Sequence, residues 1–175
     1  AQDRFCSNIP HYVYSCKSGI VNSRFRVVKR GVLCYNIHMN IRVSVSILAC
    51  KLSRRMIRLL GRGGTDLPGR IALKLCPNLL GVLAKNVTTV IVTGTNGKTT
   101  TSRMIEQSWI ESGISYFANK SGANLLSGVT AEFAVHSSLA GKCRYTHALI
   151  DADEAAFKFI AKFVDARAVV VTNVF

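Results

Sequence analysis

The stretch Val92-Thr93-Gly94-Thr95-Asn96-Gly97-Lys98-Thr99-Thr100 decides the fold of this chain. Before it, the run 87–92 is β-branched and nearly all apolar, which is typical of a strand buried on both faces. After it, the residues from Thr100 to Gly113 have the pattern of a helix that ends at a glycine. A glycine-bearing loop with a lysine between a strand and a helix predicts a phosphate-binding loop.

Each residue type in this loop suits a nucleotide. Gly94 and Gly97 lack a Cβ, so the backbone can adopt positive φ and turn its N–H groups toward phosphate oxygens. Lys98 supplies a cation for the β- and γ-phosphates, and the Thr99 hydroxyl is suited to Mg²⁺. We therefore expect ATP and Mg²⁺ as cofactors and Lys98 as a catalytic residue. The predicted nucleotide-binding residues are Gly94, Thr95, Asn96, Gly97, Lys98, Thr99 and Thr100.

The loop departs from the strict G-x-x-x-x-G-K-[ST] pattern, because Val92 stands where that pattern has its first glycine. A Gly-Lys-Thr sequence at a helix start can also be turn and cap chemistry alone. The strand before the loop, the helix after it and its two spaced glycines favour nucleotide binding.

Beyond the loop, the chain alternates between short apolar runs and helical patterns. We expect strands at 114–118, 146–150 and 168–171, and helices at 125–139 and 155–164. This order predicts an α/β fold with a P-loop-type parallel sheet and helices on its faces. Ligands of such sheets bind at the carboxyl ends of the strands.

Polar residues follow three of the expected strands. Asp151 and Glu154 come after the strand at 146–150, and we predict that they bind Mg²⁺ together with Thr99, with Asp151 also catalytic. Acids that offset the dipole of the next helix are the alternative explanation. The run 119–124 and the pair Thr172-Asn173 follow two other strands and are expected at the same edge.

The N-terminal part has a different character. Residues 1–38 show no helical or strand periodicity, and we expect them to be a disordered leader or upstream sequence read as protein, with Met39 as the initiator. Residues 39–85 are predicted to hold a basic amphipathic helix at 47–60, a glycine-rich loop at 61–69 and helical turns at 70–83 interrupted by Pro77. The nucleotide-binding domain is then expected to begin at residue 86.

Charge and composition limit the partners. The formal net charge is +14, and residues 42–74 contain eight basic residues against the single acid Asp66. This segment is either solvated surface charge or lies beside an acidic neighbour, for which nucleic acid, an anionic membrane surface and a partner subunit are the candidates. We expect no nucleic acid, because aromatic residues are not interleaved with the basic cluster at 54–62. The six cysteines form no C-x-x-C pair, and no apolar run is long enough to cross a membrane, so the chain is expected in the cytoplasm.

The loop at 93–100 resembles the ATP-binding loop of the Mur ligase and folylpolyglutamate synthase superfamily, which carries the same Thr-Asn-Gly between its glycines. The stretches 60–74, 119–125 and 151–156 are similar to the branch of that superfamily that amidates lipid II. The Leu-Pro-Gly sequence at 67–69 is the part that distinguishes this branch. The resemblance runs from about Met39 to Phe175.

This resemblance implies an incomplete Mur ligase central ATPase domain and an ATP-dependent carbon–nitrogen ligase. The expected reaction is amidation of the D-glutamate α-carboxylate of lipid II to D-isoglutamine, through an acyl phosphate and with ammonia from a GatD-type glutaminase partner. By this analogy the substrate would lie along Asn119, Ser121 and Asn124, and Asp151 would bind Mg²⁺. Because lipid II is held at a membrane, we also expect peripheral contact between the basic helix and the anionic inner face.

Two departures qualify the resemblance. The family more often has glutamate where Asp151 stands, so a water can bridge this shorter side chain to the metal. The family pattern also continues beyond Phe175 into a cysteine zinc ribbon and a domain with a further catalytic acid. We therefore expect the 175 residues to be a fragment that is inactive alone, with zinc only in the missing part. The alternatives are an amino-acid-adding Mur ligase, a folylpolyglutamate synthase-like ligase, and a non-catalytic nucleotide-binding module.

Overall fold

A computed structural model describes the backbone of residues 25–59, 66–119 and 123–173, and the side chains of these ranges from residue 41 onward. The chain divides into two compact units, residues 1–34 and residues 35–175. The fold described below is that of the second unit.

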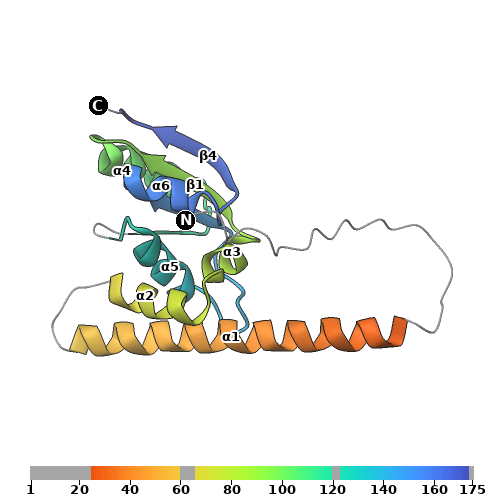
Figure 1. Ribbon diagram of the computed structural model, residues 1–175. Coiled ribbons are helices and arrows are strands. Elements are labelled where there is room, and N and C mark those ends of the chain that lie inside the picture. Colours follow the sequence, from red (N-terminus) through yellow and green to blue (C-terminus); the bar gives the residue numbers. More distant parts are fainter. Residues whose placement is uncertain (1–24, 60–65, 120–122, 174–175) are drawn as a thin grey trace, which may run out of the picture. The chain divides into compact units, whose positions relative to one another are not determined.

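The centre of this unit is a parallel sheet (Figure 1). Its strands are β1 (Thr88–Thr93), β2 (Tyr116–Ala118), β3 (His147–Asp151) and β4 (Ala166–Val171), in the order β2-β3-β1-β4. Every neighbouring pair runs parallel, and Val92 of β1 lies opposite Asp151 of β3. The predicted α/β fold with a parallel sheet and flanking helices is confirmed.

Three helices connect the strands, namely α4 (Lys98–Glu111), α5 (Leu126–Val135) and α6 (Glu154–Ile160). All three correspond to helices expected from the sequence. The residues of α5 from Ser127 to Ala134 are all buried, because this helix lies between other layers of the fold. A helix that is buried on all sides tolerates apolar residues around its whole circumference, which explains its run of small and apolar residues.

The N-terminal helices differ from expectation in two places. Helix α1 spans Phe25–Leu59, so residues 25–38 are helical although the sequence showed no periodicity there. The physical reason is that 25–59 contains no proline and a single glycine, so nothing in its composition stops a helix upstream. Residues 1–24 lie outside the described residues.

The second difference concerns the glycine-rich segment. Helix α2 spans Asp66–Leu75, so its first turn includes four residues that we expected in a loop. A proline is compatible with the first turn of a helix, where its missing N–H has no partner to lose, and Asp66 adds favourable charge there. Helix α3 (Leu79–Ala84) follows after the predicted break at Pro77. Residues 60–65 lie outside the described residues.

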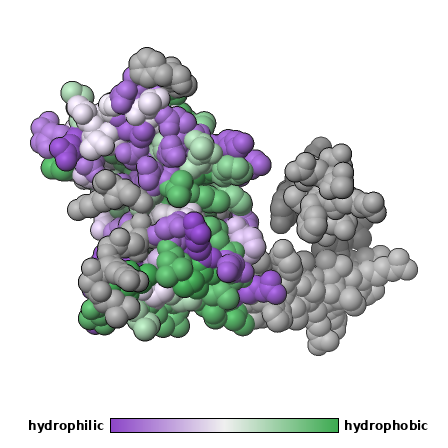
Figure 2. Space-filling model, turned by 60° about the vertical axis from the view of Figure 1, so that its left-hand side comes forward, coloured by the Kyte–Doolittle hydropathy of each residue, from purple (hydrophilic) through white to green (hydrophobic). Residues whose placement is uncertain are grey.

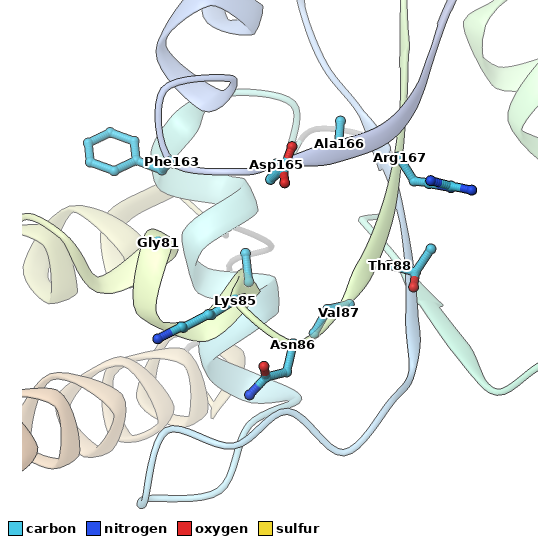
Figure 3. Close-up of a pocket in the computed structure, with 10 residues that line it drawn as sticks. Gly81, Lys85, Asn86, Val87, Thr88, Phe163, Asp165, Ala166 and Arg167 are labelled. Atoms are coloured by element: carbon cyan, nitrogen blue, oxygen red, sulfur yellow. The ribbon is translucent and has the colours of Figure 1, made fainter. Parts of the chain in front are cut away.

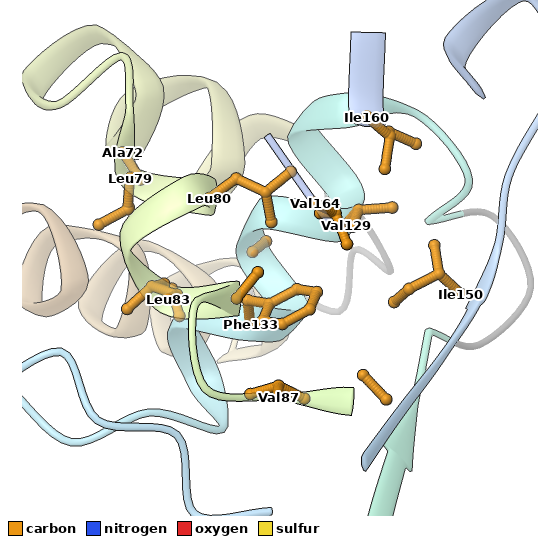
Figure 4. Packing of buried hydrophobic residues seen from close by; sticks show 14 of the residues in the cluster. Ala72, Leu79, Leu80, Leu83, Val87, Val129, Phe133, Ile150, Ile160 and Val164 are labelled. Carbon is orange, nitrogen blue, oxygen red and sulfur yellow. The ribbon is translucent and has the colours of Figure 1, made fainter. Parts of the chain in front are cut away.

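One hydrophobic core joins these layers (Figure 4). Leu79, Leu80 and Leu83 of α3 pack with Phe133 of α5 and Ile150 of β3 in the same buried cluster. Helix α1 contributes Val43, Ile47 and Cys50, whose side chains are at most 4% exposed. The sheet, the middle helices and the inner face of α1 therefore form one packed body.

A buried ion pair attaches α1 to this body. Nη2 of Arg54 lies 2.8 Å from Oε1 of Glu132 on α5, and the two side chains are only 14% and 6% exposed. The Lys51 ammonium also donates a hydrogen bond to the carbonyl of Ser137, at 2.5 Å. Two of the basic residues counted in the sequence therefore serve contacts inside the protein. Arg54 in particular is not available to an external acidic partner.

Candidate phosphate-binding site

The loop after β1 has the backbone that its glycines predict. Gly94 and Gly97 have φ of 130° and 84°, and α4 begins directly afterwards at Lys98. At Gly94 a Cβ would lie 2.3 Å from Oγ1 of Thr172 and 2.7 Å from the carbonyl oxygen of Asn173. Both the φ angle and the close approach therefore require glycine at this position.

The residues after β4 hold this loop in place. Asn173 accepts two hydrogen bonds from the loop, both at 2.8 Å. The amide of Thr95 donates to the Asn173 carbonyl, and the amide of Asn96 donates to the Asn173 side-chain oxygen. The amide of Thr172 donates to the carbonyl of Thr93 at 3.0 Å. The sequence placed Thr172 and Asn173 at the correct edge but gave no signal for this contact, because it joins residues 77 positions apart.

Lys98 lies over the loop that it follows. Its Nζ donates hydrogen bonds to the carbonyl of Gly94 and, at 3.4 Å, to that of Thr95. The amide of Thr101 bonds to the carbonyl of Gly97 and closes the first turn of α4. The remaining amides of this turn have no partner within the helix, so the loop combines a helix N-terminus with an ammonium group. This combination suits a polyanion.

Asp151 ends β3 at the same edge, and Asn119 fixes its backbone. The side-chain oxygen of Asn119 accepts from the amide of Asp151, and its Nδ2 donates to the carbonyl of Asp151, each at 2.7 Å. Nδ2 also donates to the carbonyl of Ala123 at 2.9 Å. Asn119, predicted on the substrate side, therefore uses its amide group to hold the ends of β2 and β3 together.

Thr99 and Asp151, two predicted Mg²⁺ ligands, border one cavity of about 350 Å³. The other residues that line it are Ser102, Arg103, Glu106, Ala118, Asn119 and Leu149. Oδ1 of Asp151 and Oγ of Ser102 are buried and have no hydrogen-bond partner among the described residues. Burial raises the pKa of Asp151 and Asp153 adds to the rise, while Lys98 opposes it. An unpaired carboxylate oxygen in a cavity that hydroxyl residues also line fits the ligand preference of Mg²⁺.

Glu154, the third predicted metal ligand, has different neighbours. Hydrogen bonding to its own backbone, then to Asp153 and Thr95, lowers the pKa of its carboxyl group. Glu154 is not among the residues that line the cavity beside Asp151. Within the described ranges, no three His, Cys, Asp or Glu residues are grouped as a metal site.

Two of the predicted substrate-side residues remain. Asn124 contributes its carbonyl oxygen, which accepts a hydrogen bond from the amide of Asp153 at 3.2 Å. Ser121 lies outside the described residues. The described segment after β2 therefore touches the segment after β3, as the shared edge predicts.

A larger cavity, of about 680 Å³, lies at the opposite edge of the sheet (Figure 3). It is lined by the segment from Lys85 to Thr88 and by Asp165, Ala166 and Arg167, where β1 and β4 begin. None of the phosphate-loop residues borders it. Because ligands of parallel sheets bind at the carboxyl ends of the strands, we assign the functional site to the smaller cavity.

Comparison with known proteins shows what the chain is similar to. No family model matches the chain. The chain is 37% identical over 138 residues to a protein of Streptococcus pneumoniae (strain ATCC BAA-255 / R6) named "Lipid II isoglutaminyl synthase (glutamine-hydrolyzing) subunit MurT". The matched region covers 78% of this chain and 30% of that protein. Proteins of the same name from Staphylococcus aureus strains COL and N315 are 37% identical over 131 residues, 74% of this chain and 29% of each relative. Over about three quarters of its length the chain is therefore similar to proteins named as MurT subunits, and it spans about 30% of the length of those relatives.

Proposed function

We propose that this chain contributes the ATP·Mg²⁺ site of a ligase that amidates the D-glutamate α-carboxylate of lipid II. The observation that carries the proposal is the joint position of the loop 94–97, Lys98, Thr99 and Asp151 at one edge of the sheet. The relatedness to MurT supports the choice of substrate, since those relatives are named as subunits of a lipid II isoglutaminyl synthase. The proposed setting is the cytoplasm.

The loop would hold the phosphates chiefly with its main chain. Its amides and the first turn of α4 offer N–H groups to the phosphate oxygens, and Lys98 adds a positive charge. In the structure Lys98 donates to carbonyls of the loop, which keeps its ammonium at the phosphate-binding face. The same ammonium would balance the charge that develops as the γ-phosphate is transferred.

Thr99 and Asp151 would hold Mg²⁺ in the cavity that they share. The metal, when bound, neutralises phosphate charge. Oδ1 of Asp151 is the group best suited to it, because a buried carboxylate oxygen without a partner is unfavourable until a cation or proton binds. The Glu154 carboxylate interacts with Thr95 of the loop, and it would contact the metal through a water molecule.

The chemistry requires an activated acyl group, because a carboxylate is a poor electrophile. A carboxylate oxygen of D-glutamate would attack the γ-phosphorus, and the bond to the β-phosphate oxygen would break to release ADP. Ammonia from a GatD-type glutaminase partner would then attack the acyl carbon and displace phosphate. Arg103 lines the same cavity as Asp151 and would provide a cation for the incoming carboxylate.

A reconstitution of the intact protein tests this function. Lipid II, ATP and Mg²⁺ are incubated with ammonium chloride alone, with glutamine plus the glutaminase partner, or with a panel of amino acids. We expect ADP and amidated lipid II in the first two reactions, identified by mass spectrometry. Addition of an amino acid would instead assign the chain to an amino-acid-adding ligase. ATP binding without any product would leave a nucleotide-binding module.

A further inference from the structure

Between Ile41 and Leu59, helix α1 is apolar on two opposite faces, of which the described part of the fold buries one. Val43, Ile47 and Cys50 point into the core. On the other face, a line of large apolar residues recurs every three or four positions, which places them on a single side of the helix. This outer stripe consists of Ile41, Val45, Leu48, Leu52, Met56 and Leu59, whose exposed fractions range from 46% to 82%.

The residues of the outer stripe follow one another along one side of the helix, unlike apolar residues that lie singly on a surface. From Ile41 to Leu59 it extends about 27 Å along the helix. Figure 2 shows hydrophobic residues in green along the lower edge of the described molecule, at the level where α1 runs in Figure 1. Contiguous apolar patches of this kind mark interaction surfaces.

The charges beside the outer stripe are all positive. Arg42 flanks it on one side, and Arg55 and Arg58 flank it on the other, and all three are exposed. Helix α1 contains no Asp or Glu anywhere between Phe25 and Leu59. The surface therefore fits an occupant that is apolar inside and negatively charged at its boundary.

We propose that the outer stripe of α1 binds the surface of an anionic lipid bilayer, with the helix axis in the membrane plane. The apolar side chains would enter the boundary between head groups and acyl chains, and the flanking arginines would contact lipid phosphates. No helix in the described part of the chain is long and apolar enough to cross a membrane. A second copy of the chain is a poorer occupant, because the arginines that flank the outer stripe would then face the arginines of the other copy, and like charges across an interface are unfavourable.

This surface refines the membrane contact that the sequence suggested for the basic helix at 47–60. The inward ion pair removes Arg54 from the contact, and Ile47 packs into the core instead of joining the outer stripe. The proposal rests on α1 alone and does not depend on nucleotide binding. The two claims can therefore fail separately.

Vesicle flotation of the intact protein tests the proposal. Vesicles of phosphatidylcholine alone are compared with vesicles that also contain phosphatidylglycerol. We expect flotation with the anionic vesicles only, and weaker flotation as NaCl is raised. The variant R55Q/R58Q should bind about fivefold more weakly for each arginine lost. The variant L48Q/L52Q should lose flotation while keeping its thermal melt and its ATP affinity.

Matched variants on other helices provide the controls. M104Q/I110Q alters two residues of α4 that are 69% and 58% exposed, and K158Q/K162Q removes two lysines beside Phe159. Both should float like the wild type. The proposal is overturned if the wild type does not float, if it floats equally with neutral vesicles, or if the controls lose as much binding. It is also overturned if L48Q/L52Q only converts a stable dimer into a monomer.

Discussion

The side-chain oxygen of Asn173 accepts a hydrogen bond from the amide of Asn96 at 2.8 Å, so the residue after β4 shapes the loop after β1. The same residue accepts from the amide of Thr95 through its carbonyl. The loop 94–97 is thus fixed by the segment after a neighbouring strand as well as by its own glycines. Preorganisation of this kind lowers the cost of ordering the loop when a ligand binds.

Asn173→Ala removes the side-chain acceptor and should weaken ATP binding about three- to tenfold, the range that corresponds to one neutral hydrogen bond. Calorimetric titration of the intact protein measures this change. Asn173→Asp is the control, because it keeps an acceptor for Asn96 but adds negative charge near the phosphates. It should retain the thermal stability and still lower the ATP affinity. Equal ATP affinity in all three proteins would contradict a role for this contact.

Gly94→Ala should be strongly destabilising, because its Cβ would lie 2.3 Å from Oγ1 of Thr172 and its φ is 130°. Gly97→Ala meets nothing closer than 3.9 Å, so it should cost only the strain of a left-handed backbone, about 1–2 kcal/mol. Chemical denaturation compares the two free energies of unfolding. A Gly94 variant as stable as the Gly97 variant would show that the approach to Thr172 is not tight.

Asp151→Asn should raise stability and abolish the benefit of Mg²⁺ for ATP binding. Burial raises the folded-state pKa of Asp151, so the native state holds this proton more tightly than the unfolded chain. Stability therefore decreases as the pH rises from the unfolded value of about 3.9 through the raised folded value. The variant should lack this loss, which denaturation at pH 4 and pH 7 can measure. Wild-type Mg²⁺ dependence in the variant would exclude Asp151 as a ligand.

Arg54→Met should destabilise the fold by about 3–5 kcal/mol, because it leaves Glu132 charged and buried without its partner. The double variant Arg54→Met/Glu132→Leu removes both charges and should recover most of that loss. A double-mutant cycle, measured by chemical denaturation, gives the coupling free energy between the Arg54 and Glu132 side chains. If Arg54→Met had the small effect typical of a surface residue, the inward position of Arg54 would be wrong.

The sheet and the edge that carries the candidate site could be predicted because their signals are local. A β-branched run, two spaced glycines and alternating segments define β1, the loop and the succession of strands and helices along the chain. The positions of Thr99 and Asp151 then follow from the rule that parallel strands end at one edge. Whether either residue binds Mg²⁺ remains a prediction.

The role of α1 could not be predicted in the same way, because its sequence carries two apolar faces and periodicity cannot tell which one is buried. Arg54 and Arg55 are neighbours in the sequence, yet one pairs with Glu132 and the other is exposed. Likewise, the contact of Asn173 with Asn96 depends on the pairing of β1 with β4, which no local pattern shows.

Calorimetric titration of the intact protein with ATP, with and without Mg²⁺, tests the central claim most directly. We expect binding that Mg²⁺ strengthens, and an ATP affinity about ten- to a hundredfold lower in Lys98→Met, which loses a charged hydrogen-bond donor to the phosphates. No heat of binding with the wild type, or equal affinities in the wild type and Lys98→Met, would contradict the assignment of this loop as the phosphate site.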